Sequence, residues 1–461
     1  MQKALVLKML AIGVLALILL VPLSLVSGLV SERMAYRESA QQSLSLGEGG
    51  SQTVSGPVLV LPYREKRTVV DRNSNAEREE WIDKAHYLLP EKLSIGGPLN
   101  PEQRKRGIYR FLGYKADIAL AGSYTVPNLA SLARGAELEW GTPYLSLGIR
   151  DIRGIQQSPV LQWAGQSYAF MPGTRMRQFG SGIHAPLPAL DPAGGNLAFQ
   201  FNLLLNGMGS IEILPLGRDT EVALRSSWPH PSYYGAYLPD SSSPPPSADG
   251  FAARWRTSWF STNARERFDE CLEGHCEKLE EARFGVKLIE PVDVYLKTDR
   301  AVKYGFLFVF LTFGAFFLTE VLRRVAVHPV QYGLVGMSLA LFFLLLLSLA
   351  EHMPFVLAYL VAASACVLQN SLYVRHVLRH RWGGVGFGAL LTALYGMLYS
   401  LLQSEDQALL MGALLLFGLL TLVMVLTRHL DWYRINTDSG NEASSRDGLN
   451  EADLLPEMPK K

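Results

Sequence analysis

The sequence LAIGVLALILLVPLSLVSGL, residues 10–29, contains no charged side chain. No charge occurs between Lys8 and Glu32, so residues 9–31 can cross a hydrocarbon core of about 30 Å at about 1.5 Å per helical residue. A cleavable signal peptide is the alternative, and the small residues VSG at 26–28 are compatible with cleavage. Its apolar region would exceed the usual length of about 7 to 15 residues, so we favour an uncleaved membrane anchor.

Most of the remaining apolar sequence lies in the C-terminal part of the chain. Hydrophobic residues make up 49% of the 461 residues, and the mean hydropathy of +0.13 is high for an entirely soluble protein. A second apolar block begins at Tyr304 and divides into five segments, each near the about 20 residues that a helix needs to span a bilayer. These predicted spans are residues 304–322, 330–350, 354–374, 385–402 and 408–427.

The positions of lysine and arginine predict the orientation, because basic residues close to span ends remain in the cytoplasm. The loops EHMP at 351–354 and QSEDQ at 403–407 contain no Lys or Arg. Basic residues also flank the large insert, but long translocated segments largely escape this rule. The loops placed inside contain Lys3, Lys8, Arg323, Arg324, Arg375, Arg379, Arg381, Arg428 and Arg434. With six spans, both termini face the cytoplasm and the insert is exported.

The predicted fold is a membrane protein of the α+β class. It has six transmembrane helices, one N-terminal and five C-terminal, and a large, mostly β periplasmic domain. The expected domains are an N-terminal transmembrane anchor at 1–30, a periplasmic β-rich domain at 31–303, a five-helix transmembrane block at 304–434 and a cytoplasmic tail at 435–461. The tail is polar with almost no apolar run, so we expect it to be disordered.

The insert contains short apolar or alternating runs separated by Gly, Pro, Asn and Asp, which predicts one or two β-sandwich-like units. The sequence LLLNGMGSIEIL, residues 203–214, predicts a hairpin, because Asn and Gly tolerate the positive φ of tight turns. The charged stretch at 64–80 and the Pro/Ser-rich stretch at 239–250 are expected to be solvated loops. The predicted strands are residues 56–63, 144–152, 196–205, 210–216, 220–228, 250–260 and 284–296.

The stretch RSSWPHPSYYGAYLP, residues 225–239, is a candidate periplasmic interaction loop. Two prolines flank its histidine and stiffen the backbone, which suits a connection between strands. The aromatic side chains would pack that connection onto the sheet, and we favour this structural role over catalysis because no catalytic set is complete. The candidate residues are Trp228, His230, Tyr233, Tyr234 and Tyr237.

The segment CLEGHC, residues 271–276, brings two cysteines and a histidine close together in sequence. An oxidising compartment favours a disulfide between Cys271 and Cys276. Metal binding or free thiols are the alternatives, but the second ligand pair typical of structural zinc is missing. Cys366 lies inside a predicted span, where we expect it to be an inert apolar residue.

No sequence motif for nucleotide, serine-hydrolase or zinc-protease chemistry occurs. The motif GIRDIRGI, residues 148–155, predicts an exposed ion pair. The acidic residues of the predicted spans, such as Glu320 and Glu351, lie near span ends where we expect them to reach water, and span glycines are more typical of helix packing than of a transport path. No catalytic, cofactor-binding or metal-binding residue is assigned.

Many local sequences resemble the CreD family of inner-membrane proteins of Gram-negative bacteria. They include GPVLVLPY at 56–63, GIRDIRGI, SSWPHPSYYGAYLP at 226–239, and LTRHLDWY at 426–433. The resemblance covers residues 1 to about 433. It implies a cytoplasmic-membrane protein that is associated with cell-envelope integrity, is an output of a two-component regulatory system and is linked to envelope stress. It transfers no catalytic residue.

Three functions are compatible with these features. The first is a non-enzymatic envelope protein whose periplasmic domain binds a partner or cell-wall component. The second is a wall-modifying enzyme that uses His184 or His230 with an acid such as Asp151 or Glu212. The third is a transporter or lipid-handling protein acting through the five-helix block. The expected partners are the lipid bilayer and an unidentified periplasmic or envelope partner, without nucleic acid or cofactor; the oligomeric state is not predicted.

Overall fold

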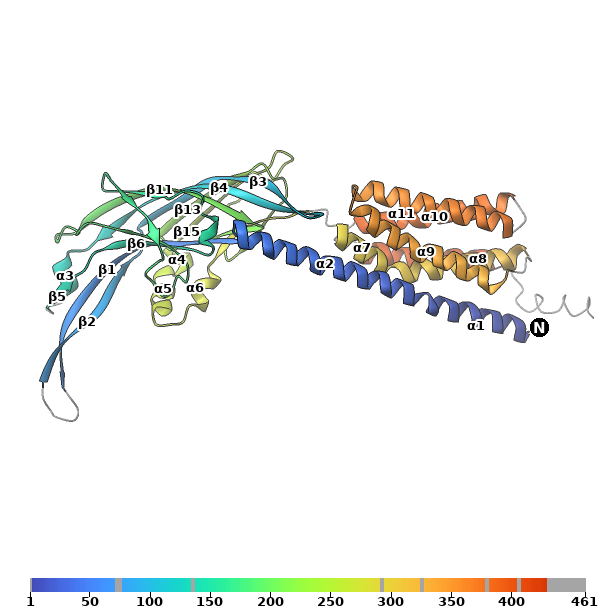
Figure 1. Ribbon diagram of the computed structural model, residues 1–461, viewed down its shortest axis with the longest axis horizontal. Coiled ribbons are helices and arrows are strands. Elements are labelled where there is room, and N and C mark those ends of the chain that lie inside the picture. The colour runs from blue at the N-terminus through green and yellow to red at the C-terminus, as the bar shows by residue number, and fades with distance from the viewer. Residues whose placement is uncertain are drawn as a thin grey trace, which may run out of the picture. The chain divides into compact units, whose positions relative to one another are not determined.

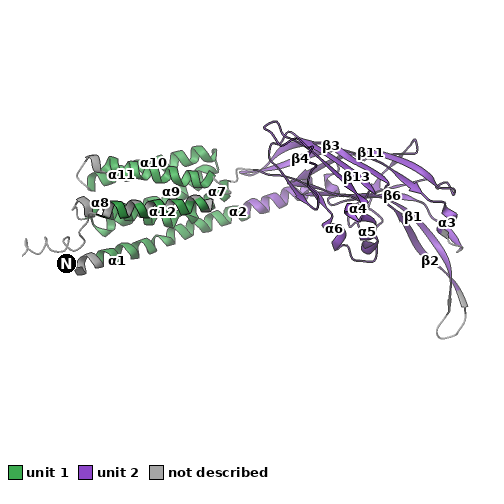
Figure 2. Ribbon diagram, turned by 180° about the vertical axis from the view of Figure 1, so that it is seen from behind, with its two compact units in different colours: residues 1–35, 292–461 green, residues 36–291 purple. Residues whose placement is uncertain are grey.

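The chain forms two compact units in the computed structural model (Figure 2). Residues 1–35 and 292–461 form the helical unit, and residues 36–291 form the β unit. Each unit has its own hydrophobic core. The structure describes residues 2–70, 77–133, 137–290, 294–323, 327–377, 381–403 and 408–428.

The helical unit supplies the apolar helices of the protein (Figure 1). Within the described residues, four helices are long and apolar enough to cross a membrane, and a fifth is added if α7 and α8, which meet at 45°, form one span. The helices are α1 (Gln2–Ile18), α2 (Leu20–Glu48, shared with the β unit), α7 (Val294–Lys303), α8 (Gly305–Arg323), α9 (Pro329–Ala350), α10 (Phe355–Val377), α11 (Arg381–Gln403) and α12 (Ala408–Thr427).

These helices coincide with the predicted apolar segments. Helices α9, α10 and α11 cover the segments at 330–350, 354–374 and 385–402, and α12 covers 408–427. The membrane α+β class is therefore confirmed, whereas a total of six crossings stays a prediction. The tail predicted to be disordered, 435–461, lies outside the described residues.

Close packing joins α1 and α2 to the C-terminal helices. A Cβ atom on Gly336 of α9 would lie 2.1 Å from Leu19 Cδ1, and one on Gly305 of α8 would lie 3.0 Å from Leu23 Cδ2. Leu19 and Leu23 are 4% and 5% exposed and belong to the same core as α8 to α11. The glycines therefore let the N-terminal helix approach the bundle, as small residues do in membrane helix pairs.

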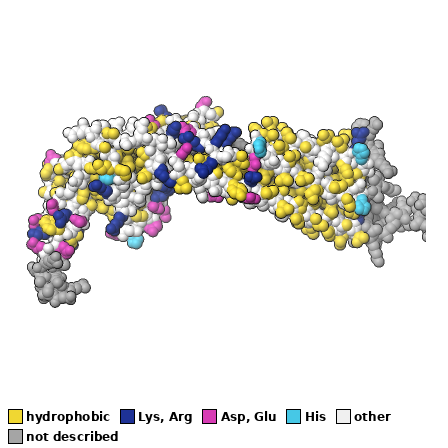
Figure 3. All heavy atoms as spheres, in the orientation of Figure 1, with side chains coloured by type: hydrophobic (Ala, Val, Ile, Leu, Met, Phe, Trp, Pro, Cys, Tyr) yellow, Lys and Arg dark blue, Asp and Glu magenta, His cyan; other side chains and the backbone are white. Residues whose placement is uncertain are grey.

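The surface of the helical unit is apolar. On the face drawn in Figure 3, hydrophobic side chains cover this unit almost continuously, whereas charged side chains are spread over the β unit. Leu341, Leu357 and Leu360 are each more than half exposed, at 52%, 53% and 55%. An apolar surface of this extent is stable in lipid and costly in water.

The β unit consists of two sheets. Sheet A runs in the order β14 (Pro231–Gly235), β16 (Phe284–Leu288), β12 (Ser210–Leu214), β1 (Gln52–Val70), β6 (Tyr144–Ile149), β10 (Gly182–Pro186) and β9 (Met171–Pro172), with β2 (Glu77–Leu88) and β5 (Leu138–Trp140) also paired to β1. Sheet B runs in the order β15 (Phe251–Ser258), β13 (Asp219–Ser226), β3 (Lys92–Arg106), β4 (Tyr109–Val126), β11 (Gly195–Met208), β7 (Val160–Trp163) and β8 (Gln166–Ala169).

The two sheets enclose one hydrophobic core, as in a sandwich. Val54 and Ile213 of sheet A and Leu120 and Val222 of sheet B are fully buried in this core. Strand β13 shows the responsible pattern, because its residues alternate between exposed and buried along the whole strand. The prediction of a large β-rich domain is confirmed.

The hairpin predicted at 203–214 is wrong. Strand β11 pairs with β4 and β7 in sheet B, whereas β12 pairs with β1 and β16 in sheet A. Gly209, at a φ of +78°, turns the chain from one sheet to the other. The turn lies where the sequence predicted it. However, Leu203 and Leu205 enter the core from sheet B and Ile213 enters it from sheet A, so the two strands belong to opposite sheets.

The solvated loop predicted at 64–80 is also wrong for the described part of that stretch. Residues 64–70 continue β1 and residues 77–80 begin β2, paired in one long antiparallel ladder. Cross-strand ion pairs join Lys66 to Glu79 at 2.8 Å and Lys84 to Glu65. Opposite charges on facing strands stabilise such a ladder without a hydrophobic face.

Two short helices cover part of the outer face of sheet A. These are α5 (Ala264–Leu272) and α6 (Glu277–Glu281). Phe268 and Leu279, 0% and 3% exposed, pack there in a small cluster with Val58 and Leu214 of the sheet. Sheet A is consequently buried on both faces in this region, which fixes the position of the helices.

Candidate functional site

The outer face of sheet A carries a row of polar side chains centred on Glu212. Residue 212 lies in β12, opposite Thr53 of β1 and Gly285 of β16. Glu212 Oε2 accepts hydrogen bonds from Thr53 Oγ1 at 2.8 Å and from Arg150 Nη2 at 3.1 Å. The Glu212 side chain is 15% exposed, so neighbouring strands hold this carboxylate in a fixed position.

Tyr234 completes the row from the edge strand β14. It lies opposite Gly285, and its hydroxyl donates to Glu212 Oε1 at 2.9 Å. Gly285 places no side chain between them, and a Cβ there would lie 2.1 Å from the carbonyl oxygen of Ile211. Burial raises the pKa of Tyr234, so its hydroxyl stays protonated as a donor.

A cleft of about 290 Å³, which we call the arginine cleft, lies beside this row. Its floor is the outer face of sheet A, and its wall includes α6 and both cysteines of the CLEGHC segment. The lining side chains include Thr53, Ser55, Arg150, Gln178, Phe179, Leu214, Leu279, Glu280 and Arg283. The cleft therefore combines two guanidinium groups and two hydroxyls with an apolar wall.

Both arginines retain hydrogen-bonding capacity. Arg150 uses Nη2 for Glu212, and Arg283 uses Nη2 for Glu280 Oε1 at 2.9 Å. Arg283 Nε is buried and has no partner among the described residues. The side chains of Arg150 and Arg283 are 44% and 27% exposed, so both can be reached from solvent. This pair was not identified from the sequence, because residues 150 and 283 are far apart in the chain.

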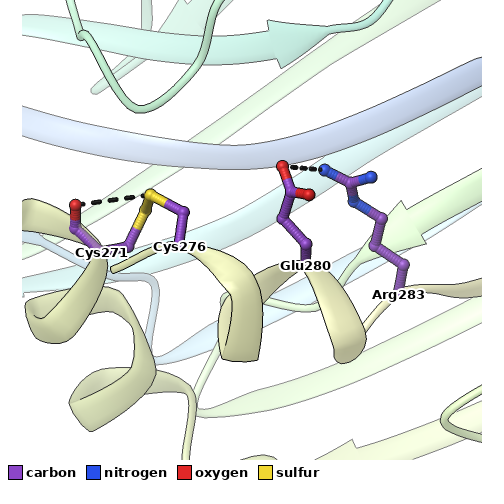
Figure 4. The surroundings of a disulfide bond; sticks show 4 residues. All are labelled: Cys271, Cys276, Glu280 and Arg283. Carbon is purple, nitrogen blue, oxygen red and sulfur yellow. Dashed lines mark hydrogen bonds and ion pairs between the residues drawn. A yellow bond between two sulfur atoms is a disulfide. The ribbon is translucent and has the colours of Figure 1, made fainter. Parts of the chain in front are cut away.

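Cys271 and Cys276 are joined by a disulfide at the end of α5 (Figure 4). Cys271 is 2% exposed, and Cys276 Sγ also lies 3.4 Å from the carbonyl oxygen of Cys271. Figure 4 shows Glu280 in the last turn of α6 and Arg283 just beyond that helix. The disulfide thus fixes the turn that leads into the arginine cleft wall.

The aromatic side chains of the candidate interaction loop anchor it to the β unit. Trp228 Nε1 donates to the carbonyl oxygen of Ile289 at 2.9 Å. Tyr233 packs edge-on against Trp255, with ring centroids 5.8 Å apart. Both side chains contact the main core, so this part of the loop has a structural role.

Tyr237 and His230 lie on the two sides of this segment. The Tyr237 hydroxyl donates to the carbonyl oxygen of Ser261 at 3.1 Å, and the ring packs against Phe284 of the core. His230 is exposed, with its ring 6.2 Å from that of Trp228. Of the five candidate residues, Tyr234 is the one that the structure links to the arginine cleft, through Glu212 and Arg150.

His184 is buried under a loop on the outer face of sheet A. Its Nδ1 lies 2.6 Å from the carbonyl oxygen of Gly173, and its ring packs edge-on against Tyr144. His184 Nε2 has no partner among the described residues, and the hydrogen bonds found there link neither His184 nor His230 to Asp151 or Glu212. The structure therefore does not assemble the enzymatic set considered from the sequence.

Asp151 makes more contacts than the exposed ion pair predicted from the sequence. Its carboxylate accepts hydrogen bonds from Gly50 N and from Arg153 N, Nε and Nη2. Arg153 Nη1 also donates to the carbonyl oxygen of Leu46 in the last turn of α2, at 2.8 Å. The hydrogen bond from Arg153 lowers the pKa of Asp151. The GIRDIRGI motif therefore fastens the end of α2 to the β unit.

In the helical unit, Glu320 is buried and hydrogen-bonded, whereas the sequence predicted that it would reach water. It is 9% exposed, and its carboxylate accepts hydrogen bonds from Lys8 Nζ, from the Tyr332 hydroxyl at 2.8 Å and from Val327 N at 3.2 Å. Lys8 of α1 forms an ion pair with this carboxylate. Glu320 therefore ties α1 to α8 and α9.

Cys366 is buried as expected but is not purely apolar in its contacts. Its Sγ lies 3.0 Å from the Tyr395 hydroxyl and 3.3 Å from Asn370 Nδ2. Asn370 Nδ2 also donates to Ser338 Oγ at 2.9 Å, so α9, α10 and α11 share one buried polar cluster. Interhelical hydrogen bonds of this kind stabilise helix packing in membranes.

Comparison with known proteins gives two matches of nearly full length. The family model described as "Inner membrane protein CreD" matches residues 4–433. The inner membrane protein CreD of Escherichia coli strain K12 is 36% identical over 417 residues, which covers 90% of this chain and 91% of that relative. The family match includes the whole β unit and most of the helical unit.

Proposed function

The chain belongs to the CreD family of inner membrane proteins, and from this premise we propose that it supports cell-envelope integrity by binding a periplasmic partner or cell-wall component through its β unit. In this proposal the protein acts without catalysis, as part of an envelope-stress response. The arginine cleft is the observation that carries the binding role, because it brings together two arginines whose hydrogen-bond donors are not all used by the described residues.

The proposed topology has both termini in the cytoplasm and residues 31–303 in the periplasm. The distribution of basic residues supports it, as nine Lys and Arg side chains fall in the short loops of one side. The Cys271–Cys276 disulfide supports it as well, since disulfides persist in oxidising compartments. Alkaline phosphatase fusions at residues 107 and 248 should be active, and a fusion after residue 377 should be inactive.

The environment of the two histidines favours binding over a wall-modifying reaction. His184 is held by a backbone carbonyl and an aromatic ring, and the exposed His230 lies edge-on to Trp228. A catalytic base has to lie within hydrogen-bond reach of the group it deprotonates. Replacing His184 and His230 separately by Ala should therefore leave complementation of a deletion strain intact, provided the variants reach wild-type abundance in the membrane.

The binding role is tested with the full-length protein in cells. A photo-crosslinking amino acid at Gln178, which lines the arginine cleft, should capture an envelope component. The same probe at Lys115, on sheet B, is the matched control and should capture it much less. Equal capture at both positions would remove the assignment of binding to this face.

Complementation connects this face to envelope function. The variant Arg283→Gln should fail to restore resistance to envelope stress at normal membrane abundance, whereas Arg254→Gln, an exposed arginine of β15, should restore it. Restoration by the helical unit alone, with the β unit deleted, would contradict the proposal.

A further inference from the structure

We infer that the arginine cleft binds the free carboxylate end of a short peptide, held between Arg150 and Arg283. This inference rests on the proposed binding role of the β unit and specifies the ligand of that site. Arginine pairs with carboxylates through several parallel N–H donors, which makes it the preferred side chain for recognising them.

The first argument is the state of the donors. Each arginine has one acidic partner that occupies Nη2, and the remaining nitrogens of Arg150 and Arg283 have no partner among the described residues. The buried Arg283 Nε is the clearest case, because a buried donor without an acceptor costs free energy until a ligand supplies one.

The second argument is the floor of the cleft. Thr53 and Ser55 are 4% and 9% exposed and lie on the same face of β1. Thr53 Oγ1 already donates to Glu212, whereas Ser55 makes no side-chain hydrogen bond within the part of the chain that the structure describes. Ser55 can therefore donate to a ligand carboxylate or accept from a peptide N–H.

The third argument concerns size and polarity. At about 290 Å³ the cleft lies at the lower limit of small-molecule sites, which span roughly 300–1,000 Å³. Its apolar wall of Phe179, Leu214 and Leu279 suits one or two small aliphatic side chains. A carboxylate with a short aliphatic peptide behind it satisfies both parts of the lining.

Glu280 provides a test of whether Arg283 attracts an anionic ligand. Its side chain is 60% exposed and pairs with Arg283, so it competes with a ligand carboxylate for the guanidinium. Glu280→Gln should therefore tighten binding of an anionic ligand, whereas Arg283→Gln should weaken it. A purely structural role of this ion pair would give a loss, or no change, in both variants.

The experiment measures binding to the purified full-length protein in detergent by isothermal titration calorimetry. The probes are acetyl-L-alanyl-L-alanine, its D,D isomer and the C-terminal amide of each. We expect each acid that binds to bind about tenfold or more tightly than its amide, because the amide removes a charge-assisted hydrogen bond. Tighter binding of the L,L acid would indicate that the natural ligand is a protein C-terminus. Tighter binding of the D,D acid would indicate a cell-wall peptide.

Arg283→Gln should lower the affinity for the acid at least about tenfold, Glu280→Gln should raise it several-fold, and the control Arg254→Gln should leave it unchanged. Thermal unfolding shows whether each variant is folded. Equal affinity for acid and amide, absence of binding by all four probes, or unchanged affinity in folded Arg283→Gln would overturn the inference. If the ligand inference fails but crosslinking in cells depends on Arg283, the proposed binding function is still supported. If a variant that cannot bind the acid complements fully, the carboxylate site is supported but the proposed function is contradicted.

Discussion

The Asp151 carboxylate and its partner Arg153 connect separate segments of the β unit. It accepts hydrogen bonds from Gly50 and Arg153, while Arg153 reaches the last turn of α2 and the Gln52 side chain joins the backbone of residues 151 and 206. Hydrogen bonds to an ionised group are worth about 1.5–3 kcal/mol each, more than typical surface pairs. The last turn of α2, which belongs to the β unit, is therefore held within that unit by side chains from well-separated parts of the chain.

The stability contributed by Asp151 should depend on pH. The hydrogen bond from Arg153 lowers the pKa of the folded carboxyl, so its contribution is present above the unfolded pKa of about 3.9 and is lost as pH falls through the folded pKa. Asp151→Asn should lower the free energy of unfolding by about 1–3 kcal/mol at pH 7. In thermal unfolding scans the difference from wild type should shrink below about pH 4, while the exposed control Asp83→Asn should show no such trend.

Glu212 should be coupled energetically to Tyr234. Glu212→Ala leaves the half-buried Tyr234 hydroxyl and Thr53 without their acceptor, which should cost about 1–3 kcal/mol. Tyr234→Phe should cost less, and the double variant should be less destabilised than the sum of the two. Urea unfolding of the four proteins measures this coupling energy, and strict additivity would argue against the hydrogen bond.

The disulfide is a covalent constraint on the α5–α6 segment. Closing a loop of this short length removes enough entropy from the unfolded chain to stabilise the folded state by about 2 kcal/mol in the chain-entropy model. Cys276→Ser should therefore lower the free energy of unfolding by about that amount under oxidising conditions. With dithiothreitol present, wild type and variant should unfold alike, which distinguishes loss of the bond from a packing defect.

Packing of α1 against α9 should depend on the small size of residue 336. A side chain there meets Leu19 Cδ1 at 2.1 Å and Phe313 Cζ at 2.8 Å, so Gly336→Leu should destabilise the helical unit by about 1–3 kcal/mol. Gly396→Leu, where no described atom lies within 4 Å, is the control. Thermal unfolding in detergent should show a lower midpoint for the first variant, and equal midpoints would contradict the observed contact.

Patterns along the chain predicted the elements better than their partners. Long apolar runs located α9 to α11, and alternation located β11 and β13, because burial on one face leaves a local record. The extension of β1 into residues 64–70 was missed, since ion pairs rather than a hydrophobic face hold that ladder together. The arginine cleft could not be predicted, because it depends on the register of β1, β6 and β12 and on the docking of α6.

Two ion pairs hold the N-terminal helix within the helical unit. Lys8 pairs with Glu320, and Arg33 Nε lies 3.4 Å from Glu351 Oε1. The two basic residues are about 25 positions apart, or about 37 Å at a helical rise of ~1.5 Å per residue, slightly more than a hydrocarbon core of about 30 Å. This spacing places one pair near each boundary of the bilayer in the proposed topology.

Removing one member of the Lys8–Glu320 pair should loosen the whole unit. Glu320→Gln leaves Lys8 without its carboxylate in a mostly buried position, so the thermal midpoint in detergent should fall, by an amount equivalent to about 1–3 kcal/mol. The exposed Glu32→Gln should have no effect. Complementation by well-expressed Glu320→Gln would also count against a transport mechanism that requires this carboxylate, and its failure would revive that alternative.

The connectivity of sheet A has a consequence for biosynthesis. Strand β1, near the N-terminal end of the β unit, lies in the middle of the sheet and pairs in parallel with β12, which in turn requires β16 at residues 284–288 as its other neighbour. Such pairing between distant segments forms slowly, because a long loop must close before any contact is gained. Sheet A therefore cannot be completed until almost the entire β unit has left the ribosome. Until then, the partly folded chain is accessible to chaperones.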